Sequence, residues 1–481
     1  MRSLTALAAA ALLVGCSSLP TAEEKPRVAL PERFSAQHAP TQAALVGPWW
    51  QTFGDAGLAR AVDQVLAQNL DLEQARLRVE QSRTLADRAR SRNLPRVDVG
   101  TSASANRLSG QNTQASAPGF DRTTSSVGAD VTATWEPDFF GRTQAAVAAE
   151  AARTQASEAD AAALALSLSA ETARRVIELR SLQAQGRLAD EAVQLEQDLV
   201  SLVEARLRGG LVTQADVLRA RAQLQSTQAS RERLKASAAD ALQALAVLLA
   251  TTPATAVAVV GDAPLPAPQG LEVFAHTPAQ VLAHRPDVAA AESRLAAASA
   301  DLAATAAERF PRVNLLASVG LAAASLSSLG STEALLATFA PSLSWRAFDF
   351  GDLDAAVAGR KASEKAAAAA YKQAVLTAFA DAETALTRVS ARQGELEAAR
   401  QAASTQLEVW EVARLQFERG VGELSAALEA RRLVNSLERE RLGSHQALAV
   451  AIVEGYRATA AGVGKTPLTA DRGAAAETRR H

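Results

Sequence analysis

The stretch GRTQAAVAAEAARTQASEADAAALALSLSAETARRVIELR, residues 141–180, opens a run that continues without proline to residue 208 and contains one internal glycine, Gly186. The run is dense in Ala, Leu, Glu, Gln and Arg, which lose little conformational freedom in a helix. At about 1.5 Å per residue, one helix of this length would extend roughly 100 Å. Such a helix is too long for one compact core, so the sequence predicts a special architecture.

The helical pattern breaks at Arg208-Gly209-Gly210 and then resumes. Before the break, apolar residues are spaced by four and three, as in a coiled-coil seam (Leu188, Ala192, Leu195, Leu199 and Leu202). After it, Thr213 and Asp216 are suited to cap a second helix that runs to about Ala250. The sequence therefore predicts a helical hairpin over residues 141–250.

The composition of the 481-residue chain excludes several classes of protein. A formal net charge of -2, with 21% charged residues, gives no reason to expect a nucleic-acid partner. Apolar residues make up 48% but aromatics only 4%, which suits closely packed, alanine-rich helices. The five histidines show no metal-ligand spacing, so no metal is expected (His38, His276, His284, His445 and His481).

The single cysteine follows an export signal. After Met1-Arg2, an apolar run ends in Leu13-Val14-Gly15-Cys16, and this run is too short to span a bilayer as a helix. The sequence resembles a bacterial lipobox, which implies a signal peptide over residues 1–15 and acylation of Cys16. Ser17 resembles a signal for sorting to the outer membrane. The alternative is an ordinary signal peptide that happens to contain cysteine.

Residues 16–48 lack periodicity and are rich in Pro, Ala and polar residues, as expected of a tether from a lipid anchor. Trp49 starts the ordered domain, and two helices follow, the second ending near Pro95.

Two strand-like alternations occupy residues 96–136. Small or apolar residues lie on one face of each (Val97, Val99, Thr101, Ala103 and Ala105; Val127, Ala129, Val131, Ala133 and Trp135), and mostly polar ones on the other. A soluble protein could use such a hairpin to cover a core. Strands of about ten residues with one apolar face also fit a lipid-facing barrel with a wet lumen. Trp135, at a strand end, would then lie at the membrane interface.

The second half of the chain repeats the first. Leu66–Leu72 resembles Leu282–Val288, and position 282 lies 216 residues after position 66. Beyond the strands the spacing becomes 210, so that position 345 follows position 135 and position 420 follows position 210. The difference falls in the strand hairpin, where a loop can shorten at little cost.

These spacings define the predicted domains. The first repeat covers residues 49–252, a linker 253–277, the second repeat 278–461, and an irregular tail 462–481. In the second repeat, a strand pair is expected over about 312–346, with Trp345 at its end, and a long helical hairpin over about 351–460. Four strands cannot close a transmembrane barrel, so several chains must contribute; three chains would give twelve strands.

The chain resembles the outer-membrane factor (TolC-like) family, in its lipoprotein branch of multidrug efflux channels. The resemblance is carried by Trp49-Trp50, by the run from Trp135 to Arg142, by the run from Leu282 to Glu292 and by the two glycine turns. It implies a homotrimer with a twelve-stranded β-barrel in the outer membrane of a Gram-negative bacterium and a long α-helical barrel across the periplasm. The implied function is passive conduction, with no catalysis and no cofactor besides lipid on Cys16.

The resemblance also implies partners and site residues. A periplasmic adaptor protein would contact the hairpin tips at Gly209, Gly210 and Gly420, while an inner-membrane pump, usually of the resistance-nodulation-division type, would supply the energy. Glu429 and Arg432 match family positions that narrow the periplasmic end of the tunnel. Ser425 stands where related channels carry a bulky apolar residue. The alternative for Glu429 and Arg432 is an ordinary solvated pair on one helix.

Other functions remain open at this point. Type I protein secretion and metal efflux share the same architecture. A lipid-anchored periplasmic coiled-coil spacer would explain the helices and Cys16 but would give the four strands no role. An enzyme has the least support, because no nucleophile motif, metal cluster or phosphate-binding loop is present in the sequence.

Overall fold

The structure is a computed structural model that describes residues 26, 28–35, 48–107, 109, 123–266 and 277–460. Cys16, most of the predicted tether and the predicted tail therefore lie outside the described residues. The chain divides into two compact units. The first contains Met1–Pro26, Val79–Ser157 and Ala291–Tyr371, and the second contains Arg27–Arg78, Glu158–Ala290 and Lys372–His481.

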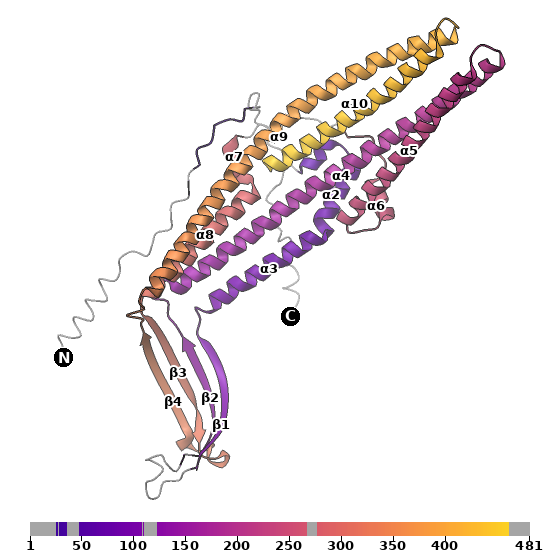
Figure 1. Cartoon of the computed structure of the whole chain (residues 1–481). Coiled ribbons are helices and arrows are strands. Elements are labelled where there is room, and N and C mark those ends of the chain that lie inside the picture. The colour runs from indigo at the N-terminus through magenta and orange to yellow at the C-terminus, as the bar shows by residue number, and fades with distance from the viewer. Residues whose placement is uncertain are drawn as a thin grey trace. The chain divides into compact units, whose positions relative to one another are not determined.

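The order of elements confirms the predicted repeat of helices, strand pair and helical hairpin (Figure 1). The first repeat contains a 3₁₀ turn (Trp49–Phe53), α2 (Ala56–Gln68), α3 (Leu70–Ser91), β1 (Arg96–Arg107), β2 (Thr123–Trp135), α4 (Arg142–Arg208) and α5 (Gln214–Leu248). The second contains α7 (Pro278–His284), α8 (Pro286–Ala306), β3 (Arg312–Ala323), β4 (Leu335–Ser344), α9 (Asp352–Glu418) and α10 (Leu424–Thr459).

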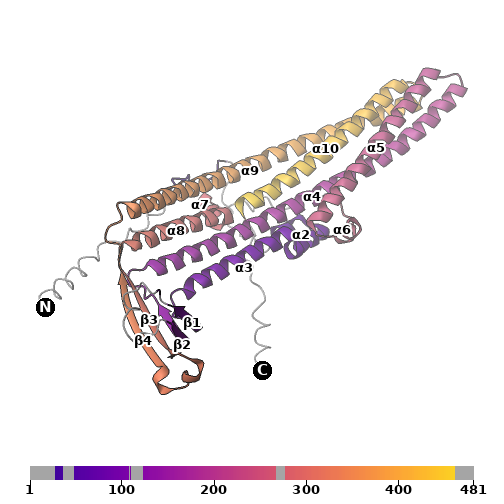
Figure 2. The same cartoon turned by 60° about the horizontal axis from the view of Figure 1, so that its bottom comes forward.

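The first unit is built around a four-stranded antiparallel sheet in the order β1-β2-β3-β4, with the strands side by side in Figures 1 and 2. One row across the sheet is apolar (Val99, Val131, Val319 and Ala337), and the neighbouring row is polar (Asp98, Thr132, Ser318 and Thr338). Successive side chains of a strand point to opposite faces, so the predicted apolar and polar faces are confirmed. The sheet departs from the pattern on the polar face of β3 and β4, where Leu316 pairs with Ala340 and Leu336 with Gly320.

The second unit contains most of the two helical hairpins, α4–α5 and α9–α10, from Glu158 of α4 and Lys372 of α9 onward. Their turns lie side by side in Figures 1 and 2. The long arms α4 and α9 each have 67 residues, close to the predicted length. A core at the other end of the hairpins buries Trp49 against Tyr456, with ring centroids 5.2 Å apart.

In the second unit, side chains at equivalent positions of the two repeats make equivalent hydrogen bonds. Asn69 caps α3 and donates from Nδ2 to the carbonyl of Leu248 at 2.9 Å. Arg285, at position 69 plus 216, donates from Nη1 to the carbonyl of Ala458 at 2.8 Å, and position 458 is 248 plus 210. The spacings found in the sequence therefore describe equivalent places in space.

The predicted linker contains a helix that the sequence analysis did not predict, α6 (Pro253–Val260). The fully buried Arg180 fixes it by donating to the carbonyls of Val260 at 2.9 Å and Gly261 at 2.6 Å. Its Nε also lies 3.2 Å from the carboxylate of Asp55. Because a buried guanidinium needs all of these acceptors, the start of this segment is a fixed part of the second unit.

Within the described residues, no single helix is long and apolar enough to cross a membrane; the bent pair Gln214–Leu248 and Pro253–Val260, at 91°, passes by length and composition alone. The same residues hold no group of three or more His, Cys, Asp or Glu side chains that could bind a metal ion.

Candidate functional site at the hairpin turns

The two hairpins end in the same type of turn. In the first, the N–H of Gly210 bonds to the carbonyl of Leu207 and the N–H of Leu211 to that of Arg206, both at 2.9 Å. The second hairpin repeats both bonds at 3.0 Å, 210 residues later, around Gly420. This Schellman pattern needs a left-handed residue after the helix, and glycine supplies it without strain, with φ of 72° at Gly210 and 78° at Gly420.

An apolar side chain projects from each turn. Leu211 is 76% exposed and Val421, its equivalent, is 79% exposed. The tips predicted from the sequence are the glycines alone, without these two residues. Their shared position directly after a repeated glycine was the signal that could have identified them.

The turns differ in their caps. The backbone N–H and hydroxyl of Thr213 both donate to the carboxylate of Asp216, at 2.9 and 2.7 Å, which confirms the predicted cap of α5. These bonds hold the pKa of Asp216 below its ordinary value. Helix α10 begins after Glu423, whose side chain makes no cap hydrogen bond and instead accepts one from the Ser425 hydroxyl at 3.0 Å.

The predicted gate residues lie on one exposed face of α10. Ser425, Glu429 and Arg432 are spaced by four and three residues, which places them in a row along the helix. Arg432 Nη2 lies 2.6 Å from Glu429 Oε1, with side chains 62% and 66% exposed. Within one protomer this is a solvated pair, and it leaves the Glu429 carboxylate accessible to other groups.

A small core joins the two hairpins near their turns. It buries Val203 of α4 and Val217 of α5 against Phe417 of α9 and Leu424 of α10. Arg206 closes it, because its guanidinium lies 3.8 Å from the centre of the Phe417 ring and donates to the Phe417 carbonyl at 2.9 Å. This contact was not predicted from the sequence.

A buried polar cluster lies farther from the turns, also between the hairpins. Glu196 of α4 is 4% exposed and accepts one hydrogen bond from Gln223 at 3.3 Å. Its second oxygen, the Nε of Arg431 and the Oδ1 of Asn435 have no hydrogen-bond partner. A cavity of about 240 Å³ borders Glu196 and Arg431. Buried polar atoms without partners are costly, so this contact between the hairpins is imperfectly satisfied.

Burial also moves the titration of this cluster. It raises the pKa of Glu196, against the opposing effects of the nearby Thr227 hydroxyl, the hydrogen bond from Gln223 and the Arg431 charge. Burial lowers the pKa of Arg431, against the attraction of Glu196 and Glu191. The attraction between Glu196 and Arg431 therefore does not make up for the hydration that each charged group loses on burial.

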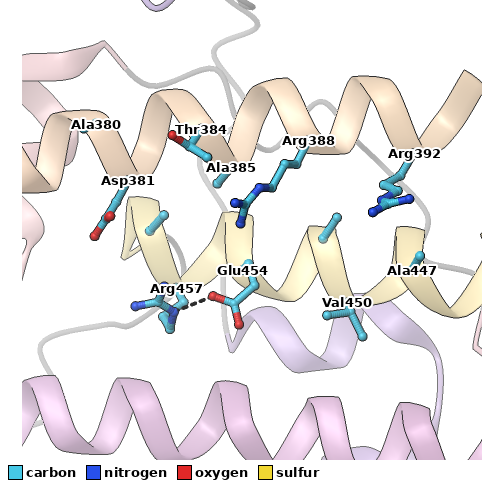
Figure 3. Close-up of a pocket in the computed structure, with 12 residues that line it drawn as sticks. Ala380, Asp381, Thr384, Ala385, Arg388, Arg392, Ala447, Val450, Glu454 and Arg457 are labelled. Atoms are coloured by element: carbon cyan, nitrogen blue, oxygen red, sulfur yellow. Dashed lines mark hydrogen bonds and ion pairs between the residues drawn. The ribbon is translucent and has the colours of Figure 1, made fainter.

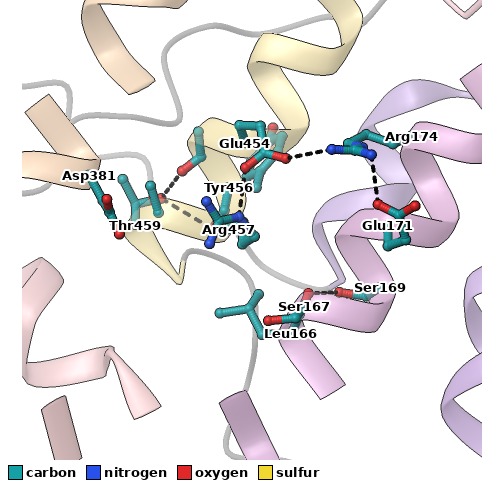
Figure 4. A network of polar contacts seen from close by, with 12 residues as sticks. Leu166, Ser167, Ser169, Glu171, Arg174, Asp381, Glu454, Tyr456, Arg457 and Thr459 are labelled. Carbon is teal, nitrogen blue, oxygen red and sulfur yellow. Dashed lines mark hydrogen bonds and ion pairs between the residues drawn. The ribbon is translucent and has the colours of Figure 1, made fainter. Parts of the chain in front are cut away.

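A charged groove lies between α9 and α10, away from the turns. It has a volume of about 520 Å³, and Figure 3 shows Arg388 reaching from α9 toward α10 across it. Figure 4 shows the network at its edge, where Glu454 lies 2.6 Å from Arg457 and 3.9 Å from Arg174 of α4. Both pairs are partly exposed, and the pair of Glu454 with Arg174 links α10 to the first hairpin.

The two predicted interface aromatics occupy equivalent positions in the first unit. The indole N–H of Trp135 donates to the carbonyl of Asn93 at 2.9 Å, and that of Trp345 to the carbonyl of Arg309 at 3.0 Å. Trp135 is 39% exposed and Trp345 60% exposed. Each ring therefore presents an apolar surface while its polar N–H is satisfied, as an interfacial position requires.

Long paired helices, a sheet with one apolar face and a two-fold repeat define the class of outer-membrane channels. The sequence profile described as outer membrane efflux protein matches residues 61–251 and 277–458. The chain is 28% identical to the outer membrane protein OprJ of Pseudomonas aeruginosa, covering 95% of both chains. It is 31% identical to the pyoverdine export outer membrane protein OpmQ of Pseudomonas putida, covering 74% of both.

The structural comparison agrees. The solved structure of the outer-membrane channel OprN has a TM-score of 0.83 and 29% identity, covering 93% of this chain and 99% of that one. The chain belongs to the outer membrane efflux protein family. The predicted fold class is confirmed: a trimer forms a helical barrel joined to a β-barrel, in the outer membrane and extending into the periplasm. The chain is an outer-membrane component of an efflux pump, and its relatives are channel proteins.

Proposed function

We propose that this protein is a passive conduit whose periplasmic end docks an adaptor through the hairpin turns and is narrowed by Glu429 and Arg432. One observation carries the proposal: the same turn occurs twice, each with a nearly bare apolar side chain, and the Glu429–Arg432 pair stands beside the second turn. Exposed loop tips are where such contacts are made, and an exposed Leu or Val has favourable surface to bury in a partner.

The Glu429–Arg432 pair would act through symmetry. Three copies around a tunnel axis would place three carboxylates and three guanidinium groups at one level. This ring would attract cations if the carboxylates lie innermost, and anions if the guanidinium groups do. Ser425, one helical turn closer to the tip, would add a polar rather than an apolar ring. Each pair is solvated within its protomer, so opening would break few strong interactions.

The partners follow from the pump. A periplasmic adaptor would bridge the tips to an inner-membrane pump, which we propose to be of the resistance-nodulation-division type. We further propose that acylation of Cys16 anchors each protomer in outer-membrane lipid, since one or more acyl chains add membrane affinity without a spanning helix. A Cys16→Ala variant that still incorporated labelled palmitate would refute the anchor.

The proposed docking role of the hairpin tips can be tested by introducing a charged side chain at each tip. Leu211→Asp and Val421→Asp each place a carboxylate where an apolar contact is proposed, and each should reduce ethidium efflux by at least about tenfold in cells containing the matching adaptor and pump. The matched control is Val247→Asp, because Val247 is 78% exposed on α5, far along the chain from either turn. Trimer abundance in the outer membrane is measured for each. Equal efflux in the tip variants and the control would contradict the docking role.

A further inference from the structure

The described sheet has two open edges, β1 and β4. Unpaired backbone N–H and C=O groups are not tolerated in hydrocarbon, so each edge needs a partner in the trimer. The family fold supplies another copy of the chain but does not say which residues meet. The internal repeat supplies that information.

Interactions within one repeat recur in the other. The pair Val97↔Ala133 of β1 and β2 becomes Val313↔Leu343 of β3 and β4 when 216 and 210 are added to the two positions. All the β3–β4 pairs obey the same rule. The two tryptophan indole bonds described above follow it too. The paired strands of the two halves, and the tryptophans at their ends, are therefore equivalent residue by residue.

A second set of contacts joins the first repeat to the second. Strands β2 and β3 pair with Thr132 opposite Ser318, whose side-chain oxygens lie 3.3 Å apart. After β2, the ring of Phe140 stacks on that of Phe310, with centroids 4.8 Å apart and an angle of 10°. If the same contacts are shifted by one repeat, their first partner lies in the second repeat of one protomer and their second partner in the first repeat of the next protomer.

The two residues equivalent to Phe140 and Phe310 in the proposed junction are exposed when a protomer is considered alone. Position 140 plus 210 is Phe350, which is fully exposed at 105%, and position 310 minus 216 is Leu94, which is 65% exposed. Phe350 also has a φ of 54°, which is unfavourable for a residue with a side chain. A strained backbone conformation persists where surrounding contacts stabilise it. Phe350 has few such contacts within its own protomer, so we expect them in the next one.

The trimer closes its barrel by placing β4 of one protomer beside β1 of the next. We propose that these two strands pair in the register of β2 and β3, and that Phe350 packs on the partner subunit's Leu94. Applying the two spacings to Thr132↔Ser318 places Ser342 opposite the partner subunit's Ser102. Applied to Trp135↔Leu315, they place Trp345 opposite the partner subunit's Val99.

This register keeps the faces of the sheet continuous. Leu343 and Phe339 lie opposite the partner subunit's Thr101 and the partner subunit's Ala105, in rows that belong to the apolar face. A slip of one residue would move Leu343 beside residues of the polar face. Pro341 of β4 has no backbone N–H, so the ladder lacks one donor at this position.

Cysteine pairs measure the register in the full-length, membrane-inserted protein. Ser342→Cys with Ser102→Cys should form disulfides between protomers and give a ladder up to covalent trimer after mild oxidation. The matched control is Thr132→Cys with Ser318→Cys, the equivalent pair inside one chain, which should oxidise to a similar extent without any change in oligomer size. Cys16, the one natural cysteine, is kept in every variant, and the otherwise unchanged protein gives the background.

Two shifted pairs keep the same face: Ser342→Cys with Ser104→Cys, and Ser342→Cys with Gly100→Cys. A shift of two residues moves the partner by about 6.6 Å, beyond the reach of a disulfide, so both should cross-link at least about fivefold less. Stronger cross-linking by a shifted pair, or none by any pair while the control oxidises, would overturn the proposed register. This junction concerns assembly alone, so its failure would leave the proposed gate and tips unaffected.

The aromatic contact has its own test. Phe350→Ala should make the trimer dissociate in detergent at a lower temperature than the unchanged protein does, whereas Phe348→Ala should not. Phe348 is a matched control because it is 89% exposed, two residues away, and its equivalent in the first repeat is Asp138 rather than an aromatic residue. Equal loss of trimer in both variants would refute the packing of Phe350 on the partner subunit's Leu94.

Discussion

The turn of the first hairpin and the turn of the second share a backbone but differ in what holds them. Both place a glycine in the left-handed region and return two N–H groups to the preceding helix. Beyond the first, Thr213 and Asp216 close a capping box. Beyond the second, Glu423 makes no side-chain cap, and the exposed pair of Glu429 and Arg432 follows.

This difference assigns different roles to similar structures. At the start of α5, the carboxylate of Asp216 bonds both the backbone N–H and the hydroxyl of Thr213, which restricts the first turn of the helix. The start of α10 lacks that support, so it can unwind or pivot at lower cost. The first hairpin is therefore suited to be the fixed frame of the periplasmic end, and the second to be its moving part.

The largest expected effect comes from removing the gate charges. Glu429→Ala combined with Arg432→Ala should raise single-channel conductance in planar bilayers about tenfold. The reason is that all three protomers lose the charged pair that is proposed to narrow the tunnel. The control is Glu438→Ala with Arg441→Ala, which removes another pair of the same spacing on α10, 2.9 Å apart. Similar conductance in the two variants would mean that Glu429 and Arg432 do not narrow the tunnel.

The next effect tests whether the two turns really share a backbone. Gly210→Ala and Gly420→Ala should each destabilise their own turn by about 1 kcal/mol, since a left-handed conformation disfavours a Cβ. The turn amides should then exchange with deuterium roughly fivefold to tenfold faster in both variants. Gly209→Ala is the control, because Gly209 has no positive φ and its added Cβ would meet atoms only at 3.5 Å or more. A strong effect in one turn alone would break the equivalence.

The caps should respond unequally. Asp216→Ala removes the capping box and should speed amide exchange in the first turn of α5 about fivefold. Glu423→Ala removes a side chain that caps nothing, so exchange at the start of α10 should change less than about twofold. Hydrogen–deuterium exchange with mass spectrometry measures both. Equal effects would remove the distinction between a capped frame and an uncapped moving part.

The smallest effect is a pH dependence of the contact between the hairpins. Because the pKa of Glu196 is raised in the packed state, that state holds the proton more tightly than separated hairpins would. Packing should therefore gain stability as the pH falls through the raised pKa, and keep the gain below the ordinary value of 4.5. Exchange of amides around Glu196, corrected for intrinsic rates, should slow by about threefold or less from pH 7 to pH 5.

Glu196→Gln is the matching variant, since it keeps an acceptor for Gln223 but cannot ionise. The pH dependence should disappear in this variant, while the opposite charge of Arg431 and the nearby Glu191 remain. If the variant shows the same slowing as the unchanged protein, another group is responsible for it.

Most of the architecture could be predicted from the sequence because the helices and strands follow strict periods and the chain repeats itself. Glycine at positions 210 and 420, with Thr213 and Asp216 behind the first, identified the turns and a cap. The repeat was then enough to locate the second hairpin. These features depend on local backbone chemistry, which a sequence pattern records directly.

The missed features depend on what lies across from a residue. Glu196 occupies a place in a charged helical stretch that looks solvated, and only its packing against α5 and α10 buries it. Arg180 looks like any helical arginine until α6 supplies its acceptors. Leu211 and Phe350 are exposed apolar residues, and the partners proposed for them belong to other chains, which no sequence period reveals.

The difference between a fixed first hairpin and a moving second one is tested most directly in the unchanged protein. Hydrogen–deuterium exchange of the assembled trimer in membranes should compare the first two turns of α5, after Thr213, with those of α10, after Glu423. The account predicts several-fold faster exchange at the start of α10, on the order of fivefold for one missing cap. Equal protection of the two helix starts, or slower exchange in α10, would contradict it.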